Sequence, residues 1–252
     1  MKGPMPTTSP FRSVAAWLRA RRGWALVIAL CVVGIAGFAA WRTNQVRMET
    51  GLMTASREEV VRRPELVRFA ARQARPLFTK HCAECHGEDL KGRQGSGTPN
   101  LTDKVWLYGD GVFRLERDIL YGVRSGHQKS MDLAEMRAYG LRGQLSQTEI
   151  RNLVQYIIRL SGRPADPEAA SLGRELYFRA LCDDCHSGDG RGNIDYGATD
   201  FTANTWDYGG DPESLYESIY YGRHGIMPAF IGKLSLTQIR ALAVYVQTAS
   251  ER

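Results

Sequence analysis

Two short segments of the sequence carry the same reactive pattern, a C-x-x-C pair followed at once by histidine. They are Cys82, Cys85 and His86, and, 100 residues further on, Cys182, Cys185 and His186. The pattern is the attachment motif of c-type haem. On one helical turn the two thiols reach the two vinyl groups of a porphyrin, and the adjacent imidazole lies under the iron. The sequence therefore predicts two covalently bound haem c groups, with His86 and His186 as iron ligands.

Other uses of paired cysteines fit the spacing poorly. A structural zinc site needs four ligands and usually draws its two C-x-x-C pairs from nearby in the sequence, whereas these pairs are far apart. A redox dithiol would require a βαβ context, which the sequence does not provide. A disulfide framework is also disfavoured, because the fifth cysteine, Cys31, lies alone in an apolar stretch and leaves an odd number.

The sixth iron ligand decides what such haems do. Methionine opposite histidine raises the reduction potential and closes the iron, which gives an electron carrier, whereas an open position favours peroxidase or gas-binding chemistry. For the second haem we expect Met227, with His224 as the nearby rival. For the first haem we expect Met136, which precedes the last helix of its segment much as Met227 does, and the alternatives are Met131 and His127.

The haem motifs belong to an internal repeat that fills residues 70–252. Residues 81–87 match 181–187, and residues 101–109 match 201–209, at an offset of 100. The first copy then carries extra residues, after which 145–156 matches 234–245 at an offset of 89. Two copies are too few for a solenoid, so the sequence predicts two tandem domains, residues 70–163 and 164–252. A short Gly- and Pro-containing linker joins them, with Asp166 as the expected N-cap of the next helix and Pro167 as its first residue.

Each predicted domain ends in an amphipathic helix. In the first, Ser146 and Glu149 form a capping box, and the apolar residues that follow recur at helical spacing. Ser235 and Gln238 start the second helix in the same way. A shorter helical stretch precedes each C-x-x-C-H motif, and the Gly-, Asn- and Thr-rich middles show no strand periodicity. The expected fold class is therefore all-α, with haem completing a small core.

A membrane anchor precedes the repeat. Residues 24–41 are free of charge and bounded by Trp24 and Trp41, a length just sufficient to cross a bilayer. Basic residues are concentrated before this segment, which predicts a cytoplasmic head (1–23) and export of everything after residue 41, with 42–69 as a connecting segment. A cleaved signal peptide is the alternative, and it would export the same residues.

The net charge of +6 is unevenly distributed. Residues 1–47 carry seven basic and no acidic residues, residues 70–163 carry 15 basic and 10 acidic, and residues 164–252 carry 7 basic and 13 acidic. The high pI therefore does not indicate a nucleic-acid-binding protein. The acidic second repeat suits a lysine-rich donor protein, with Asp183, Asp184 and Asp189 as candidate contacts, and the basic first repeat suits anionic lipid or an acidic partner subunit.

The combination of an anchor, two haem motifs and the run Asn100-Leu101-Thr102-Asp103 with Trp106-Leu107-Tyr108-Gly109 resembles the dihaem subunit III of cbb3-type, C-family haem–copper oxidases. The second repeat adds Met227-Pro228-Ala229-Phe230 to this resemblance, while Arg137 stands where the family usually has proline. The resemblance implies a membrane protein with two class I cytochrome c domains on the periplasmic side of a bacterial inner membrane.

The resemblance also implies a function. Electrons would pass from a soluble or membrane-bound cytochrome c through the two haems to a catalytic subunit that reduces O₂ to water. The chain itself offers no catalytic residues for O₂ chemistry. The alternatives are the cytochrome subunit of another membrane complex, such as a dehydrogenase or nitric oxide reductase, a dihaem peroxidase, and, last, a haem-based sensor.

Overall fold

The computed structural model describes residues 11–93 and 95–250, and it confirms the all-α class. These residues form ten α-helices and one 3₁₀ helix, and the hydrogen-bonded bridges among them are isolated rather than part of strands. Residues 1–10, which belong to the predicted basic head, lie outside the described residues. The chain divides into two compact units, residues 1–50 and 51–252.

The first unit consists of most of the long helix α1 (Phe11–Thr54). The part of this helix from Val27 onward is long and apolar enough to cross a membrane. Its apolar side chains, such as Leu30, Val33 and Ile35, are exposed rather than packed against other protein. Exposed apolar side chains on a helix of this length are what a lipid-facing span requires.

The second unit holds both haem motifs on short helices. Its elements are α2 (Arg57–Arg62), α3 (Pro64–His81), α4 (Ala83–His86), α5 (Val112–Tyr121), α6 (Gln147–Leu160), α7 (Pro167–Arg179), α8 (Asp183–His186), η1 (Phe201–Ala203), α9 (Pro212–Tyr221) and α10 (Leu236–Ser250). The capping box predicted at Ser146 and Glu149 is present at the start of α6. Ser235 and Gln238 exchange the equivalent hydrogen bonds before α10.

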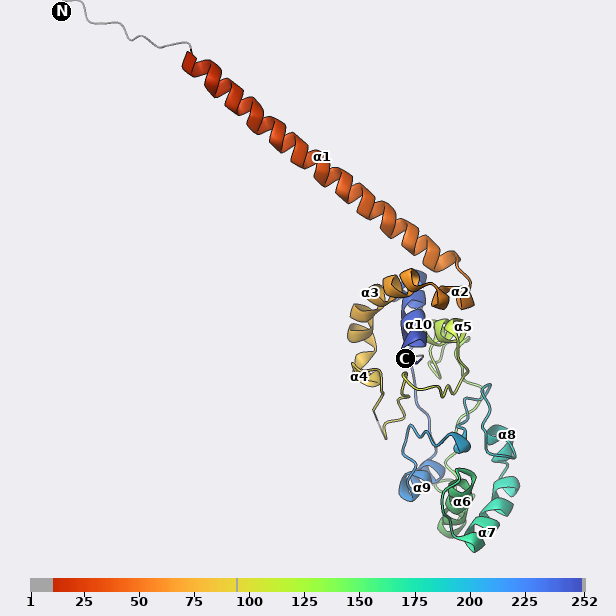
Figure 1. Ribbon diagram of the computed structural model, residues 1–252. Helices are drawn as coiled ribbons and strands as arrows, with labels where there is room; N and C mark the ends of the chain where they lie inside the picture. The colour runs from red at the N-terminus through yellow and green to blue at the C-terminus, as the bar shows by residue number, and fades with distance from the viewer. Residues whose placement is uncertain (1–10, 94, 251–252) are drawn as a thin grey trace, which may run out of the picture. The chain divides into compact units, whose positions relative to one another are not determined.

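These helices pack in two groups that do not follow the order of the repeat (Figure 1). In the first helix group, α10 packs against α3 and α5, with α2 and α4 beside them. In the second helix group, α6 packs against α7 and α9, together with η1. The last helix of each repeat therefore completes the core around the haem motif of the other repeat.

A short connection explains the pairing of α6 with α7. Only residues 161–166 join these helices, and a helix–helix connection of this length makes its two helices antiparallel neighbours. Asp166 caps α7 through the amide of Ala169, as predicted, and its own amide donates to the side chain of Gln155 on α6. The backbones approach closely, because a Cβ atom at Gly173 would lie 2.0 Å from the Asn152 carbonyl oxygen.

The two groups share aromatic cores of the same kind. In the first helix group, the rings of Phe78 on α3 and Tyr245 on α10 meet edge to face at 5.9 Å. In the second helix group, Tyr156 on α6 meets Tyr177 on α7 at 5.3 Å. Fully buried Ile239 and Leu242 line α10, as Ile150 and Leu153 line α6. The apolar faces read from the sequence are therefore the buried ones, each facing the other repeat.

The chain crosses between the groups at two glycines. Gly122 follows α5 with φ +74°, and a Cβ atom there would lie 2.4 Å from the carbonyl oxygen of Met227. Gly222 follows α9 with φ +73°, and its Cβ atom would lie 2.4 Å from the carbonyl oxygen of Met136. Only glycine tolerates both the positive φ and the approach, so the crossing depends on these two residues.

Candidate functional site

Each C-x-x-C-H motif folds into one tight helical turn. The amide of His86 donates to the Cys82 carbonyl at 2.9 Å, and the amide of His186 donates to the Cys182 carbonyl at the same distance. The two cysteines and the histidine of each motif therefore lie on one turn, as the haem motif predicts. Gly87 and Ser187 end these turns with positive φ.

The histidines are half-buried beside backbone carbonyls and aromatic rings. The Nδ1 atom of His186 donates to the Thr199 carbonyl at 3.1 Å, and its ring stacks on Phe201 at 4.4 Å. Burial lowers the pKa of both His86 and His186, and the Thr199 and Pro99 carbonyls oppose that shift. An imidazole whose Nδ1 hydrogen faces a carbonyl presents the lone pair of Nε2 to a metal.

The first cysteine of each motif is a poor thiolate. Burial raises the pKa of Cys82 to about 11 and that of Cys182 to about 12. All four cysteines of the two motifs are free thiols and are therefore available for covalent attachment of a porphyrin.

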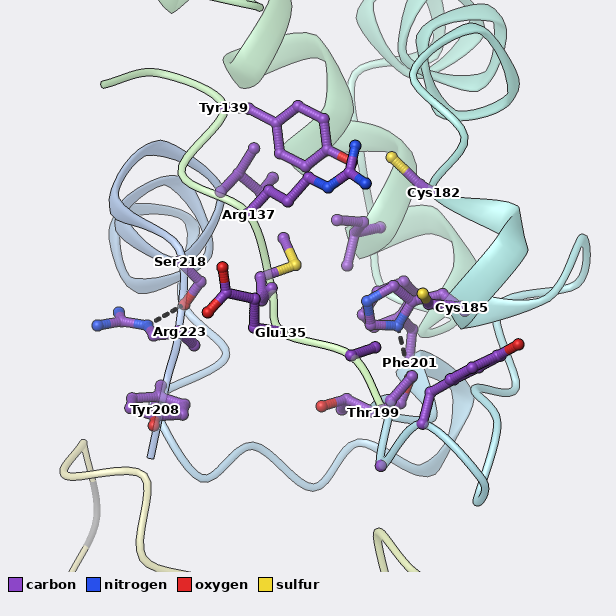
Figure 2. Close-up of a pocket in the computed structure, with 18 of the residues that line it drawn as sticks. Glu135, Arg137, Tyr139, Cys182, Cys185, Thr199, Phe201, Tyr208, Ser218 and Arg223 are labelled. Atoms are coloured by element: carbon purple, nitrogen blue, oxygen red, sulfur yellow. Dashed lines mark hydrogen bonds between the residues drawn. The ribbon is translucent and has the colours of Figure 1, made fainter. Parts of the chain in front are cut away.

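A cavity of about 670 Å³ opens beside Cys182, Cys185 and His186 (Figure 2). This volume is within the range of cofactor pockets. The walls are largely apolar and aromatic, and they come from α6, α7, α9 and the loops around them: Leu153, Ile157, Tyr177, Phe201, Trp206, Leu215 and Ile219. The segment through Glu135, Arg137 and Tyr139 passes opposite the cysteines (Figure 2).

Met136 lies in this cavity, with the second histidine rather than the first. Its carbonyl accepts a hydrogen bond from the amide of Arg223 at 3.0 Å. Three residues on, the amide of Tyr139 donates to Ile219 at the end of α9. From sequence alone, Met136 is expected at the haem of Cys82 and Cys85. The structure instead brings it to the wall of the second pocket, because residues 122–146 cross from α5 to the second helix group.

Met227 makes the reciprocal crossing. It exchanges two backbone hydrogen bonds with Val123, at 2.9 and 3.0 Å, just beyond α5. The following residues, Phe230 and Ile231, donate to carbonyls of α5, and the ring of Phe230 lies 6.1 Å from that of His81. Met227 therefore belongs to the first helix group, which carries Cys82, Cys85 and His86.

The two rival histidines contact other side chains, and Met131 lies beside Val123, the residue that also pairs with Met227. His127 stacks on Tyr121 at 4.9 Å, and its Nδ1 atom accepts from the amide of Lys129. His224 is half exposed and pairs with Glu135 at 3.0 Å. Met131 pairs with Val123 and Arg124 through its backbone, within the extra residues of the first repeat. In the sequence, only the short 161–166 connection signals that Met136 and Met227 lie in opposite helix groups.

Comparison with known proteins identifies the family of the chain. A model of the family described as "Cytochrome C oxidase, cbb3-type, subunit III" matches twice in tandem, over residues 69–157 and 168–246. The chain is 37% identical over 197 residues to the Cbb3-type cytochrome c oxidase subunit FixP of Bradyrhizobium sp. (strain ORS 278), which covers 78% of this chain and 67% of that protein.

Two further relatives agree. The FixP subunit of Azorhizobium caulinodans is 38% identical over 192 residues, covering 76% of this chain and 64% of its own. The CcoP subunit of Cereibacter sphaeroides is 33% identical over 183 residues, which cover 73% of this chain and 62% of that protein. The chain therefore spans about two thirds of the length of these relatives. The apolar α1 helix and these matches make it a membrane-anchored cytochrome c, and the predicted resemblance is confirmed: the chain belongs to the subunit III family of cbb3-type cytochrome c oxidases.

Proposed function

We propose that the chain carries two covalent haem c groups whose methionine ligands are exchanged between the repeats. Cys82, Cys85 and His86 would hold the first haem with Met227 as the sixth ligand. The second would be held by Cys182, Cys185, His186 and Met136. The observation that carries this proposal is the presence of Met136 in one cavity with the second C-x-x-C-H motif.

The residues of the second pocket fit a haem. Two free thiols, a half-buried imidazole and a thioether line a cavity of suitable size whose walls are largely apolar and aromatic. A bound haem supplies one-electron redox chemistry, and the protein tunes it through the axial ligands and the surrounding polarity. A histidine and a methionine on each iron leave no position open for peroxide, which favours an electron carrier over a dihaem peroxidase.

The proposed role is to pass electrons from a donor cytochrome c to the catalytic subunit of a terminal oxidase that reduces O₂ to water. The family and the names of the relatives support this role above a dehydrogenase or nitric oxide reductase. The excess of basic residues before the α1 span supports a cytoplasmic N-terminus, with both haems on the periplasmic side of a bacterial inner membrane.

Charge supports electron entry at the second pocket. Residues 126–226, which supply the second helix group, carry 10 basic and 15 acidic residues. The second helix group is therefore acidic, even though part of it comes from the first repeat. Asp184 and Asp189 are exposed near this pocket, as is Leu181, whereas Asp183 is half-buried. An apolar spot with acids beside it suits a lysine-rich donor. The first haem would then deliver electrons to the oxidase.

Salt dependence tests the entry site. Replacing Asp184 and Asp189 with Asn should slow reduction by a basic donor cytochrome severalfold at low ionic strength, and the difference should vanish at high salt. Asp166 and Glu168, acids at the start of α7, provide a matched neutralised control. Equal salt dependence in both double variants would exclude entry at this surface.

Purification from native membranes tests the function itself. The tagged full-length chain should bring high-spin haem b and copper with its own two c haems when isolated in mild detergent. The same purification without other cofactors, but with different partner proteins, would assign the cytochrome to another complex. A preparation with fewer than two c haems per chain would contradict the proposed cofactor content.

A further inference from the structure

Arg124 bridges the two repeats at the edge of the second pocket. It follows Val123, the residue that pairs with Met227, and its side chain lines the cavity beside the second haem motif. Its Nε atom donates to the Gly225 carbonyl at 2.6 Å, and one terminal nitrogen donates to the Tyr108 hydroxyl at 2.6 Å. Both hydrogen bonds fix the direction of the guanidinium group.

The guanidinium group of Arg124 is half-buried, and the groups that accept its hydrogen bonds are neutral. Among the ion pairs of the described residues none includes Arg124, and its two hydrogen-bond partners are a carbonyl and a hydroxyl. The other arginines of the cavity differ: Arg142 and Arg223 face Glu135 and Glu217, and Arg137 is exposed. Removing a cation from water without an anion is costly, so the site favours an anionic ligand.

The cavity places that anion at a definite end. The cysteines bond the vinyl edge of a porphyrin, and the two propionates lie on the opposite edge. Tyr208 and Arg223 lie across the cavity from Cys182 and Cys185 (Figure 2). Arg124 belongs to the Tyr208 end, because a Cβ atom at Gly225 would lie 3.0 Å from the Tyr208 hydroxyl and 3.8 Å from a terminal nitrogen of Arg124.

We propose that Arg124, a residue of the first repeat, forms an ion pair with a propionate of the haem held by Cys182 and Cys185. The inference rests on the proposed haem content and adds a residue that tunes one haem. A cation beside a propionate offsets its negative charge and so makes the iron easier to reduce. The first repeat thereby sets the potential of the haem attached to the second.

Loss of this cation should lower one midpoint potential and leave the other in place. In the full-length haem protein, Arg124→Gln should reduce the equilibrium constant for reduction of the second haem about tenfold, which is ~59 mV for one electron. Spectroelectrochemical titration resolves the two haems as two components. Replacing Cys82 and Cys85 with Ala removes the first haem. The single component that this variant still shows in the titration identifies the potential of the second haem.

Matched variants separate charge from structure. In Arg124→Lys the midpoint potential of the second haem should stay close to the wild-type value, because lysine keeps the positive charge. Arg142→Gln should leave both components unchanged, since Arg142 lines the same cavity but is 56% exposed. If Arg124→Gln yields too little haem protein, Tyr108→Phe tests the same contact, because a less firmly held Arg124 should lower the equilibrium constant of the same component about threefold.

The outcomes distinguish this inference from the proposed function. A wild-type chain without haem on Cys182 and Cys185 would overturn the proposed function. Two normal haems in the wild type, with potentials that do not move in Arg124→Gln, would overturn the propionate pairing alone. A shift confined to the first haem, or an equal shift in Arg124→Lys, would also overturn it.

Discussion

At the residue scale, Met136 and Met227 occupy equivalent places in opposite helix groups. Each methionine accepts a backbone hydrogen bond from the residue that follows a crossing glycine. Met136 accepts from Arg223, after Gly222, and Met227 accepts from Val123, after Gly122. The sequence revealed both methionines, because few others lie within the repeats. It could not reveal which helix group each methionine joins, since sequence distance favours the nearer histidine and the chain crosses between the groups before each methionine.

Single-haem variants test the exchange directly. In a chain whose Cys182 and Cys185 are replaced by Ala, Met227→Ala should open the remaining iron to carbon monoxide, whereas Met136→Ala should not. In the chain whose Cys82 and Cys85 are replaced instead, the two effects should be reversed. Carbon monoxide difference spectra of the reduced proteins measure both. The opposite pattern would restore pairing within each repeat.

Asp207 is a half-buried carboxyl in the wall of the same cavity. Burial, reinforced by the nearby charge of Asp103, raises the pKa of Asp207 from 3.8 to about 6. Because this pKa is raised, protonation favours the folded state: the contribution of Asp207 to stability is full below pH 3.8 and is lost as pH rises through about 6. The second repeat has Asp207 where the first has Leu107.

We predict that the potential of the second haem depends on pH around this value. Reduction removes a positive charge from the iron and so favours a protonated Asp207. The midpoint potential should fall as pH rises through about 6, by at most ~59 mV per unit. Asp207→Asn should flatten the slope and raise the potential at pH 8. Titrations at a series of pH values measure this, and an equal slope in both proteins would contradict it.

At the scale of the elements, local sequence predicted the helices well. The caps at Ser146, Asp166 and Ser235 are present, and the apolar stripes of α6 and α10 are buried. Their partners were not predictable from those stripes, because the faces of α6 and α10 are alike in spacing and size. The length of the connections decides the pairing. Only six residues join α6 to α7, so these two helices must pack side by side.

A buried ion pair fixes α10 to the first helix group. Arg240 on α10 is 8% exposed and lies 3.3 Å from Glu116 on α5, which also binds Arg57 on α2 at 3.0 Å. Another nitrogen of Arg240 donates to the Ala55 carbonyl at 2.6 Å. Three elements therefore meet at a single carboxylate, which lies at the end of α10 nearer its N-terminus.

Removal of Arg240 should loosen this group selectively. Arg240→Ala leaves Glu116 partly buried with one cation, and we expect a loss of roughly 3 kcal/mol in the free energy of unfolding. Arg179→Ala breaks the exposed pair with Glu149 and should cost less than about 1 kcal/mol. Denaturant titration of the haem protein compares the two. Similar losses would show that the ion pair of Arg240 contributes no more than a surface pair.

At the scale of the whole molecule, the repeats are consecutive in sequence but interlocked in space. Contact between α10 and α3 joins residues more than 150 positions apart. The predicted boundary at residues 163 and 164 falls inside the α6–α7 hairpin, at the centre of the second helix group. As a boundary between independent domains it remains a prediction, and truncation tests it.

A chain that ends at residue 163 should fail to complete its haem site. It keeps α3, Cys82, Cys85 and His86 but lacks Met227 and α10, so its reduced haem should bind carbon monoxide and its α3 should be cut rapidly by protease. The full-length chain, treated in parallel, should resist both. A fragment with a closed, low-spin haem would show instead that residues 70–163 form a self-sufficient domain.

The interlocked helices also impose an order on biogenesis. In the proposed function the chain is exported from its N-terminus, so Cys82 and Cys85 would emerge about 140 residues before Met227 and α10. The proposed first haem would then be attached before its pocket is complete. A covalent bond keeps the porphyrin in place until then, whereas coordination alone would let it escape. In the proposed arrangement, the first haem site would therefore be completed only after α10 has been synthesised, which makes synthesis through α10 a condition for a working electron path.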